Sequence, residues 1–134
     1  MSAETDLLQG LKADLAAAGV TTKIVFGDLP STSDECIAAT VYAAIDEPKI
    51  ARSRFRVQLM IRGAVNDSLS PGEIAGGVFD VLQGLENRPY GAVSLVQCFR
   101  VSAVPLGVDD LKRTSRADNY ECDVDLPLTA GRPF

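Results

Sequence analysis

The sequence predicts an α+β fold, a mostly antiparallel sheet of about five strands with two helices packed on it, in the order α-β-β-β-α-β-β. Two segments carry apolar residues at helical spacing, and one segment alternates strictly between apolar and basic residues. Strands and helices do not alternate regularly, which argues against a doubly wound parallel sheet. The length of 134 residues suits one domain. We therefore expect a single domain over 1–134, with 129–134 as a tail without pattern.

The first helix is expected over about residues 5–18. Its leucines recur at positions 7, 8, 11 and 15, which gives one apolar stripe. Gly19 is a natural C-cap because glycine adopts a positive φ without strain. Gly10, in the middle of the helix, indicates a close contact with another element.

Two strands follow the first helix. Residues 20–26 predict a short strand, which the turn sequence Gly27-Asp28-Leu29-Pro30 ends before a polar loop over 31–35. Residues 36–45 are apolar at both odd and even positions. This pattern is typical of a central strand that is covered on both faces.

The third strand, residues 52–62, has the clearest pattern in the chain. Phe55, Val57, Leu59 and Ile61 alternate with mostly basic or polar residues. A period of two places successive side chains on opposite faces of a strand. We therefore expect one face in the core and one basic face.

The second half of the chain contains a helix and two strands. Ser70-Pro71-Gly72-Glu73 is typical of a capping box at a helix start, and Gly76-Gly77 predicts a close approach of this helix to the sheet. Residues 87–91 are expected to end the helix. Strands are predicted over 93–104 and 118–126, and residues 105–117 between them are predicted to form a long loop, which is usually functional or mobile.

Composition excludes several function classes. The net charge is −5, whereas proteins that bind nucleic acid through phosphates are usually basic. The chain has no histidine, so Ser-His and Cys-His nucleophile pairs are absent, and its three cysteines are too few for a zinc site without histidine. We expect no cofactor or metal and no enzymatic activity, and we expect the thiols to be free and buried. No apolar run reaches the roughly 18–20 residues that span a bilayer, so no membrane partner is expected.

Two charged segments allow two interpretations. Residues 49–62 contain five basic and no acidic side chains: Lys49, Arg52, Arg54, Arg56 and Arg62. The last strand carries Glu121, Asp123 and Asp125 on one face. The two sets either pair across the sheet, which we favour, or leave the arginines as a docking surface for an acidic partner or phosphates. The carboxylates lie too far apart along a strand to share one Mg²⁺.

The order of these elements resembles the small tail-terminator (minor capsid, head–tail joining) proteins of long-tailed bacteriophages. The likeness covers most of the chain, from the helix that ends at Gly19 to the strand that begins Asn119-Tyr120. Pro105-Leu106-Gly107-Val108-Asp109-Asp110 with Arg113 is similar to the pattern P-x-G-x-D-x-x-x-R of that family. Leu111-Lys112 is a departure, because a glycine is expected near the arginine.

The resemblance implies a virion protein at the head–tail junction, made in the host cytoplasm. It implies a homo-oligomer, a hexameric ring that caps the tail tube, stops its polymerisation and joins the head connector, or stopper, protein. DNA would pass through the lumen without being read. Candidate contacts with a neighbouring copy or the tube are Arg52, Arg54, Arg56, Arg62, Asp109, Asp110 and Arg113.

Two other functions remain open from the residues. A small oligomeric α+β module could hold an anionic small molecule with its arginines. An enzyme without histidine could use carboxylates such as Asp109-Asp110, although solvation of a loop explains this pair more simply. The mass of the oligomer, alone and with tail tubes, separates a ring from a ligand-binding monomer or dimer.

Overall fold

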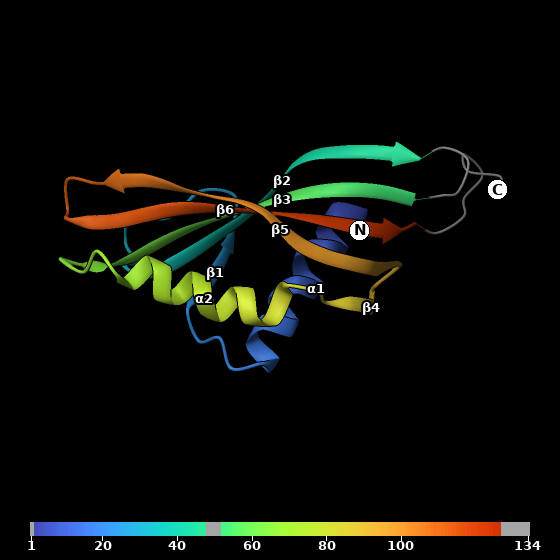
Figure 1. Ribbon diagram of the computed structural model, residues 1–134, viewed down its shortest axis with the longest axis horizontal. Helices are drawn as coiled ribbons and strands as arrows, with labels where there is room; N and C mark the ends of the chain where they lie inside the picture. Colours follow the sequence, from blue (N-terminus) through green and yellow to red (C-terminus); the bar gives the residue numbers. More distant parts are fainter. Residues whose placement is uncertain (1, 48–51, 127–134) are drawn as a thin grey trace.

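The computed structural model describes residues 2–47 and 52–126 and confirms the α+β class. The sheet is mixed and has six strands in the order β1-β2-β3-β6-β5-β4, one strand more than expected. Both helices lie on the same face of this sheet (Figure 1). The bounds are α1 Ala3–Ala17, β1 Lys23–Phe26, β2 Cys36–Glu47, β3 Arg52–Val65, α2 Ser70–Leu82, β4 Glu86–Tyr90, β5 Val93–Val108 and β6 Arg113–Asp125.

Helix α1 confirms the pattern that predicted it. Ser2 caps it by accepting a hydrogen bond from the Thr5 amide at 3.1 Å, and Leu7, Leu11 and Leu15 are buried while Leu8 is partly buried. Gly19 follows the helix with φ +97°, as expected of a glycine at this position. A Cβ at Gly10 would overlap the Tyr90 ring, which confirms the predicted close contact.

Two details predicted for α2 are wrong. Ser70 does not cap the helix: its hydroxyl accepts a hydrogen bond from the Ala64 amide, and Asp67 Oδ1 instead accepts from the amides of Leu69 and Ser70, both at 3.1 Å. No atom lies within 4 Å of a Cβ built at Gly76 or Gly77, so these glycines do not serve a close approach. The helix nevertheless packs its apolar stripe on β3, β5 and β6.

Strands β3 and β6 form the centre of the sheet, with a partner on both sides. The alternation in β3 is confirmed: Phe55, Val57, Leu59 and Ile61 are at most 4% exposed. Arg62 departs from the pattern because it is itself buried. The helix-facing side of the sheet and the two helices enclose a single hydrophobic core.

Strand β2 is covered only in its first part, which corrects the prediction of a strand buried on both faces. Residues 36–39 are buried and pair with β1 in parallel, while the other side of β2 pairs antiparallel with β3. After a bulge at Tyr42 the strand passes beyond β1, and Tyr42 and Ile45 are 50% and 46% exposed. The apolar residues of β2 therefore continue beyond the point where β1 ends, which is why the sequence pattern suggested a strand that is buried throughout.

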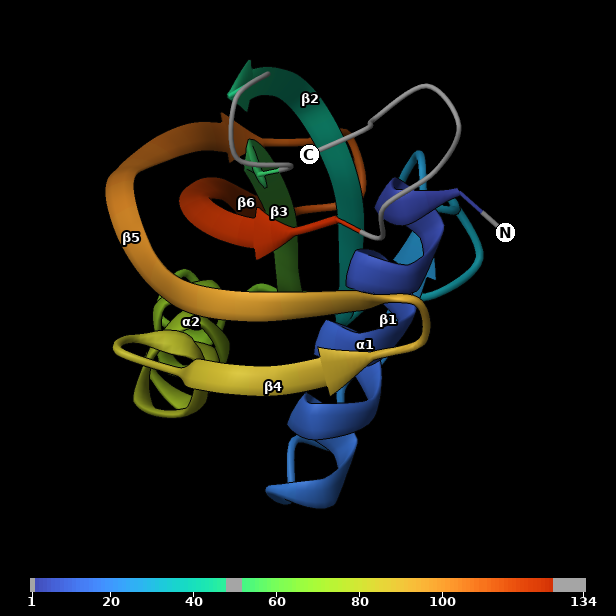
Figure 2. The ribbon, with the colours of Figure 1, turned by 90° about the vertical axis from the view of Figure 1, so that its right-hand side faces the viewer.

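Strand β4 was not predicted, since Asn87 and Pro89 indicated only the end of a helix. Glu86–Tyr90 pairs antiparallel with the start of β5 and forms the outer strand of the sheet. Proline is tolerated there because an outer strand needs hydrogen bonds on only one side. The β4–β5 hairpin lies across α1 (Figure 2).

The predicted loop over residues 105–117 is wrong. Strand β5 continues to Val108 and β6 begins at Arg113, so most of this segment is a hairpin that turns at 109–112. The hairpin extends the sheet beyond α2 (Figure 1). Residues 101–108 are exposed on both faces and β5 is bulged, so this part of the strand lacks the alternating pattern on which the prediction of a strand depends.

All three cysteines are buried and free, as predicted. Cys98 and Cys122 are register partners on β5 and β6, and their Sγ atoms lie 3.5 Å apart. The hydrogen bond with Cys98, and then burial, raise the pKa of the Cys122 thiol. Lys49 and the predicted tail at 129–134 lie outside the described residues.

Candidate functional site

The basic residues of β3 pair with the acidic residues of β6 on the sheet face away from the helices. Three arginines, Arg52, Arg54 and Arg56, face three carboxylates, Glu121, Asp123 and Asp125, and we call these six residues the arginine ladder. The N–O distances are 2.8 Å from Arg52 to Asp125, 3.1 Å from Arg54 to Asp123 and 3.4 Å from Arg56 to Glu121.

The ladder confirms the interpretation in which the two sets pair across the sheet. The hydrogen bonds that Arg52 and Arg54 donate to Asp125 and Asp123 raise the pKa values of both guanidinium groups. The arginine side chains are still 39–46% exposed. They form a rigid polar surface on which each positive charge already has a negative neighbour.

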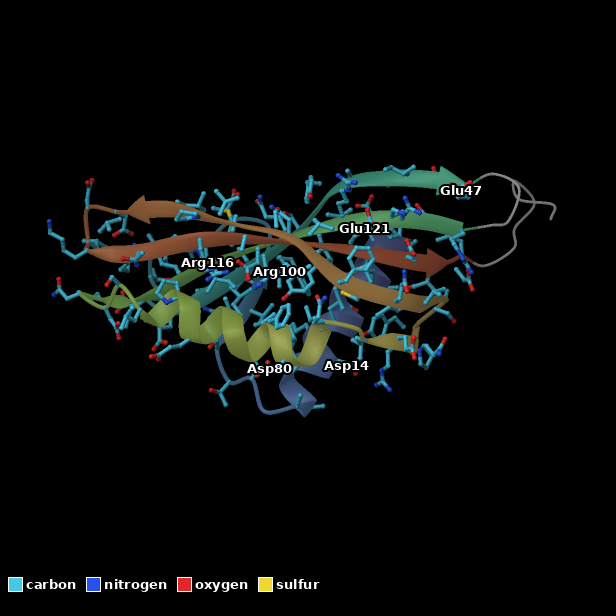
Figure 3. All side chains as sticks on the ribbon, in the orientation of Figure 1. Asp14, Glu47, Asp80, Arg100, Arg116 and Glu121 are labelled. Carbon is cyan, nitrogen blue, oxygen red and sulfur yellow. The ribbon has the colours of Figure 1, made fainter. Side chains whose placement is uncertain are left out.

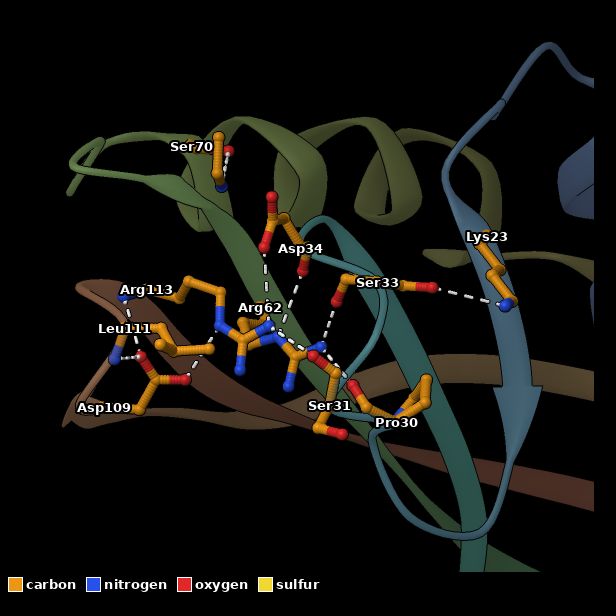
Figure 4. A network of polar contacts seen from close by, with 11 residues as sticks. Lys23, Pro30, Ser31, Ser33, Asp34, Arg62, Ser70, Asp109, Leu111 and Arg113 are labelled. Carbon is orange, nitrogen blue, oxygen red and sulfur yellow. Dashed lines mark hydrogen bonds and ion pairs between the residues drawn. The ribbon is translucent and has the colours of Figure 1, made fainter.

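Arg62 and Arg113 are buried and do not form a docking surface. Arg62 donates to the backbone carbonyls of Pro30, Ser33 and Asp34, the last at 3.0 Å. Arg113 Nη1 donates to the carbonyl of Ser31 at 3.1 Å (Figure 4). Both guanidinium groups therefore hold the loop between β1 and β2 against the sheet.

The turn of the β5–β6 hairpin explains the spacing of Asp109 and Arg113. Asp109 Oδ1 accepts hydrogen bonds from the amides of Leu111 and Arg113, and Arg113 Nε donates to Asp109 Oδ2 at 2.9 Å (Figure 4). These bonds lower the pKa of Asp109. Lys112 has φ +64°, the left-handed region that favours glycine, which is why a glycine is expected there.

The predicted site residues thus fall into separate groups. Arg52, Arg54 and Arg56 belong to the ladder, whereas Arg62, Asp109 and Arg113 gather at the loop and the hairpin turn. Asp109 and Asp110 are both exposed at the turn, but it is Asp109 that accepts the hydrogen bonds that close it.

A buried ion-pair cluster under α2 was missed. Asp118 is completely buried and accepts from Arg116 Nε at 2.7 Å and from Arg100 Nη1 at 3.4 Å. Figure 3 labels the two arginines. Arg100 also lies over the Phe79 ring of α2, 4.4 Å from its centroid. Asp118 lies on the same face of β6 as Tyr120 and Cys122. The alternation of the strand therefore indicated that this carboxylate points into the core, and it could have been predicted from the sequence. The cluster anchors α2 to the sheet.

Exposed apolar side chains gather at two places on the sheet. One is the far half of β5 with the hairpin turn: Val101, Val104, Leu106, Val108 and Leu111 are 44–62% exposed. The other is the far half of β2, with Tyr42 and Ile45. Contiguous exposed apolar residues of this kind typically mark interaction surfaces.

The described residues offer little else in the way of a site. No group of three or more potential ligands among them is placed to hold a metal ion. Neither described helix is long and apolar enough to cross a bilayer. A groove of about 280 Å³ between the start of α2 and the hairpin is open and mostly apolar.

Comparison with known proteins finds a likeness among solved structures. No protein-family model matches the chain, and no curated protein matches its sequence. Among solved structures, the fold is similar to that of a chain in the virion of a native gene transfer agent (GTA) particle. The TM-score is 0.70 at 16% identity, over 92% of this chain and 94% of the other.

Proposed function

We propose that this chain is a structural protein of a phage-like virion and that, more specifically, it acts as a tail terminator. In that role a homohexameric ring caps the tail tube, ends its polymerisation and joins the connector of the head. DNA passes through the lumen of the ring without sequence-specific contacts.

The observation that carries this proposal is the likeness to a virion chain over almost the whole length of both chains. A shared fold does not by itself determine function, so the surfaces of this chain supply the second argument. Many of its exposed apolar residues lie on strand edges and on the β5–β6 hairpin, where we expect neighbouring subunits to make contact. Neither feature requires a catalytic group.

The ladder and the hairpin have different roles in this proposal. Arg62, Asp109 and Arg113 hold the hairpin and the loop in shape. Asp110, at the tip, contacts the tube or a neighbouring copy. Arg52, Arg54 and Arg56 contribute an outer surface of balanced charge, which suits a polar contact better than the capture of a free anion.

An anion-binding module has weaker support. Such a module needs arginines with unpaired guanidinium groups, whereas each arginine named above already has a carboxylate or carbonyl partner. A ligand that displaced those partners from a guanidinium group would have to bind strongly enough to offset the free energy of the contacts that are lost.

Electron microscopy of the purified protein mixed with tail tubes tests the function directly. We expect rings of six-fold chain mass by native mass spectrometry and rings at one end of each tube. A monomer or dimer that leaves the tube ends bare and gains thermal stability from phosphate would overturn the proposal in favour of the anion-binding module.

A charge swap separates docking by the ladder from pairing within it. Arg54→Glu places a third carboxylate beside Glu121 and Asp123, and the double variant Arg54→Glu/Asp123→Arg restores an ion pair with reversed direction. If the ladder contacts another subunit, the single variant and the swap both lose tube capping. If pairing within the chain is its whole role, the swap recovers capping.

A further inference from the structure

Two segments of the sheet edge lack a backbone partner within the described residues. Beyond Ala39, β2 passes β1, so residues 40–47 pair only with β3. We call this segment the β2 edge. On the other side of the sheet β4 pairs with residues 93–97 of β5, Leu85 accepts from the Cys98 amide, and Gln83 Oε1 accepts from the Arg100 amide. Residues 101–108, the β5 edge, then pair only with β6.

The two edges lie at diagonally opposite corners of the sheet. At one end of the sheet, Cys36 of β2, Arg62 of β3, Ser115 of β6 and Gly107 of β5 lie in one row across the strands. At the other end, Glu47 of β2, Arg52 of β3 and Asp125 of β6 form a row. The β2 edge is therefore at the end where β4 covers β5, and the β5 edge is at the end where β1 covers β2 (Figure 1). At each corner the outer strand is shorter than the strand it covers, so the outline of the sheet has a step there, and the two steps are complementary in shape.

The direction of the strands matches these steps. Three successive antiparallel pairings, β2–β3, β3–β6 and β6–β5, make β5 run opposite to β2. Two copies in the same orientation, displaced diagonally, bring the β2 edge of one beside the β5 edge of the other as antiparallel strands of similar length. A contact between two different surfaces of the same chain is heterologous and generates a ring when its rotation closes.

Side chains on the two edges agree with this contact. Paired residues on neighbouring strands point to the same face of a sheet. Ile45 pairs with Arg54, and Val104 pairs with Ala117, which pairs with Met60. Both side chains therefore project from the face away from the helices, as Arg54 does. Each is 46% exposed. Antiparallel alignment also brings the acidic end of the β2 edge, Asp46 and Glu47, toward Arg100 of the next copy. Exposed edges are usually blunted by charge, yet residues 101–108 carry none.

We infer that the β2 edge of one copy pairs antiparallel with the β5 edge of a second copy, so that the sheet continues from subunit to subunit. The inference rests on the proposed ring and names its contact surface. Pro105 has no N–H, and β5 is bulged after Arg100 and after Pro105, so the backbone hydrogen bonds between the two edges are interrupted. The apolar contact of Ile45 with Val104 therefore contributes to the stability of the contact together with the hydrogen bonds on either side.

Cysteine cross-linking tests the geometry of the contact. Ile45→Cys and Val104→Cys are made in separate chains, with the buried native thiols retained, and treated with a short bismaleimide. We expect a cross-linked dimer when the two variants are mixed and none from either variant alone, because a heterologous contact joins unlike positions. The variant with both cysteines should give a series of cross-linked oligomers of increasing mass. A Val104–Val104 cross-link, from a two-fold contact, or no cross-link in the mixture overturns the inference.

Lysine substitutions test the energy of the contact. Ile45→Lys and Val104→Lys should each raise the concentration needed for assembly at least about tenfold, since a buried lysine opposes edge pairing. Val65→Lys is the matched control, because Val65 is 43% exposed but lies on the central strand β3. Circular dichroism should show all three variants folded.

The outcomes distinguish this contact from the function. If Ile45→Lys and Val104→Lys form rings and cap tubes as the unmodified chain does, the contact is wrong while the proposed function stands. If the mixed cysteine variants cross-link but the assemblies do not bind tube ends, the contact is correct and the tail-terminator function is wrong. Binding of the edges to tube protein alone, without cross-linking between copies, also overturns the contact.

Discussion

The contact between Gly10 and Tyr90 shows how one atom limits the choice of residue. Gly10→Ala places a methyl group inside the Tyr90 ring, so the ring or α1 must move. We expect a loss of about 1–3 kcal/mol in the free energy of unfolding, measured by urea denaturation. Gly76→Ala is the control: nothing lies within 4 Å of its Cβ, and a gain of about 0.5–1 kcal/mol is expected. Equal effects of the two substitutions would contradict the described packing.

Asp14 links α1 to β4 through charge. Arg88 donates two hydrogen bonds to it, at 2.9 Å and 2.7 Å, and Tyr90 donates a third. These bonds, those from Arg88 first, lower the pKa of Asp14 below its ordinary value of 3.8. Its stabilising contribution is therefore present above pH 3.8 and disappears as the pH falls through the lower value in the folded protein.

Asp14→Asn tests this linkage. We expect the midpoint of thermal unfolding at pH 7 to fall by about 4 °C, which corresponds to about 1 kcal/mol in a chain of this size. The difference from the unmodified protein should shrink below pH 3.8. Asp80→Asn, on the exposed side of α2, removes the same charge and should leave the midpoint nearly unchanged. A difference that stays constant down to pH 2 would show that Asp14 is not charged in its pair.

At the scale of the element, the start of α2 depends on Asp67 and not on Ser70 and Glu73. Asp67→Ala should cost about 1 kcal/mol in unfolding free energy, because two helix amides lose their acceptor. Asp67→Asn keeps an acceptor oxygen and should recover most of this loss. If Glu73→Ala costs as much as Asp67→Ala, the capping box predicted from the sequence is correct after all.

The β5–β6 hairpin illustrates how a polar motif acts as a structural element. Asp109 closes the turn, and Arg113 ties it to the loop between β1 and β2. The spacing D-x-x-x-R is thus explained by the hydrogen bonds of a turn without any ligand. In the proposed ring this turn would act indirectly, by holding in shape a hairpin that exposes Val104, Leu106 and Val108.

For the whole molecule, the sheet predicts a graded pattern of hydrogen exchange. Amides of β3 and β6 should exchange most slowly, since both strands have partners on both sides. Outward amides in residues 40–47 and 101–108 should exchange fast in the monomer and become protected on assembly. Mass spectrometry of peptides before and after ring formation measures both. Fast exchange at these edges in the assembled protein would contradict edge pairing.

Local patterns in the sequence were enough to predict α1, the alternation of β3, the burial of the cysteines and the pairing of the arginines with carboxylates. Each depends on a period or on charges that neighbouring residues display. Residues 86–90 and 105–117 show no alternation of apolar and polar residues, because they are largely polar or exposed and the β5 backbone is bulged. They are strands because a neighbouring strand offers backbone hydrogen bonds, and that neighbour is distant in the sequence.

The sequence by itself determined the apolar stripe of α1, the core face of β3 and the positions of the charges, since these follow from residue type and spacing. Only the tertiary structure decided which charges become internal supports, as with Arg62, Arg113 and Asp118, and which strand edges stay open. Both outcomes depend on the strand order β1-β2-β3-β6-β5-β4, in which short outer strands cover only part of β2 and of β5. Partners in a sheet are selected by long-range packing, which leaves no local pattern in the chain.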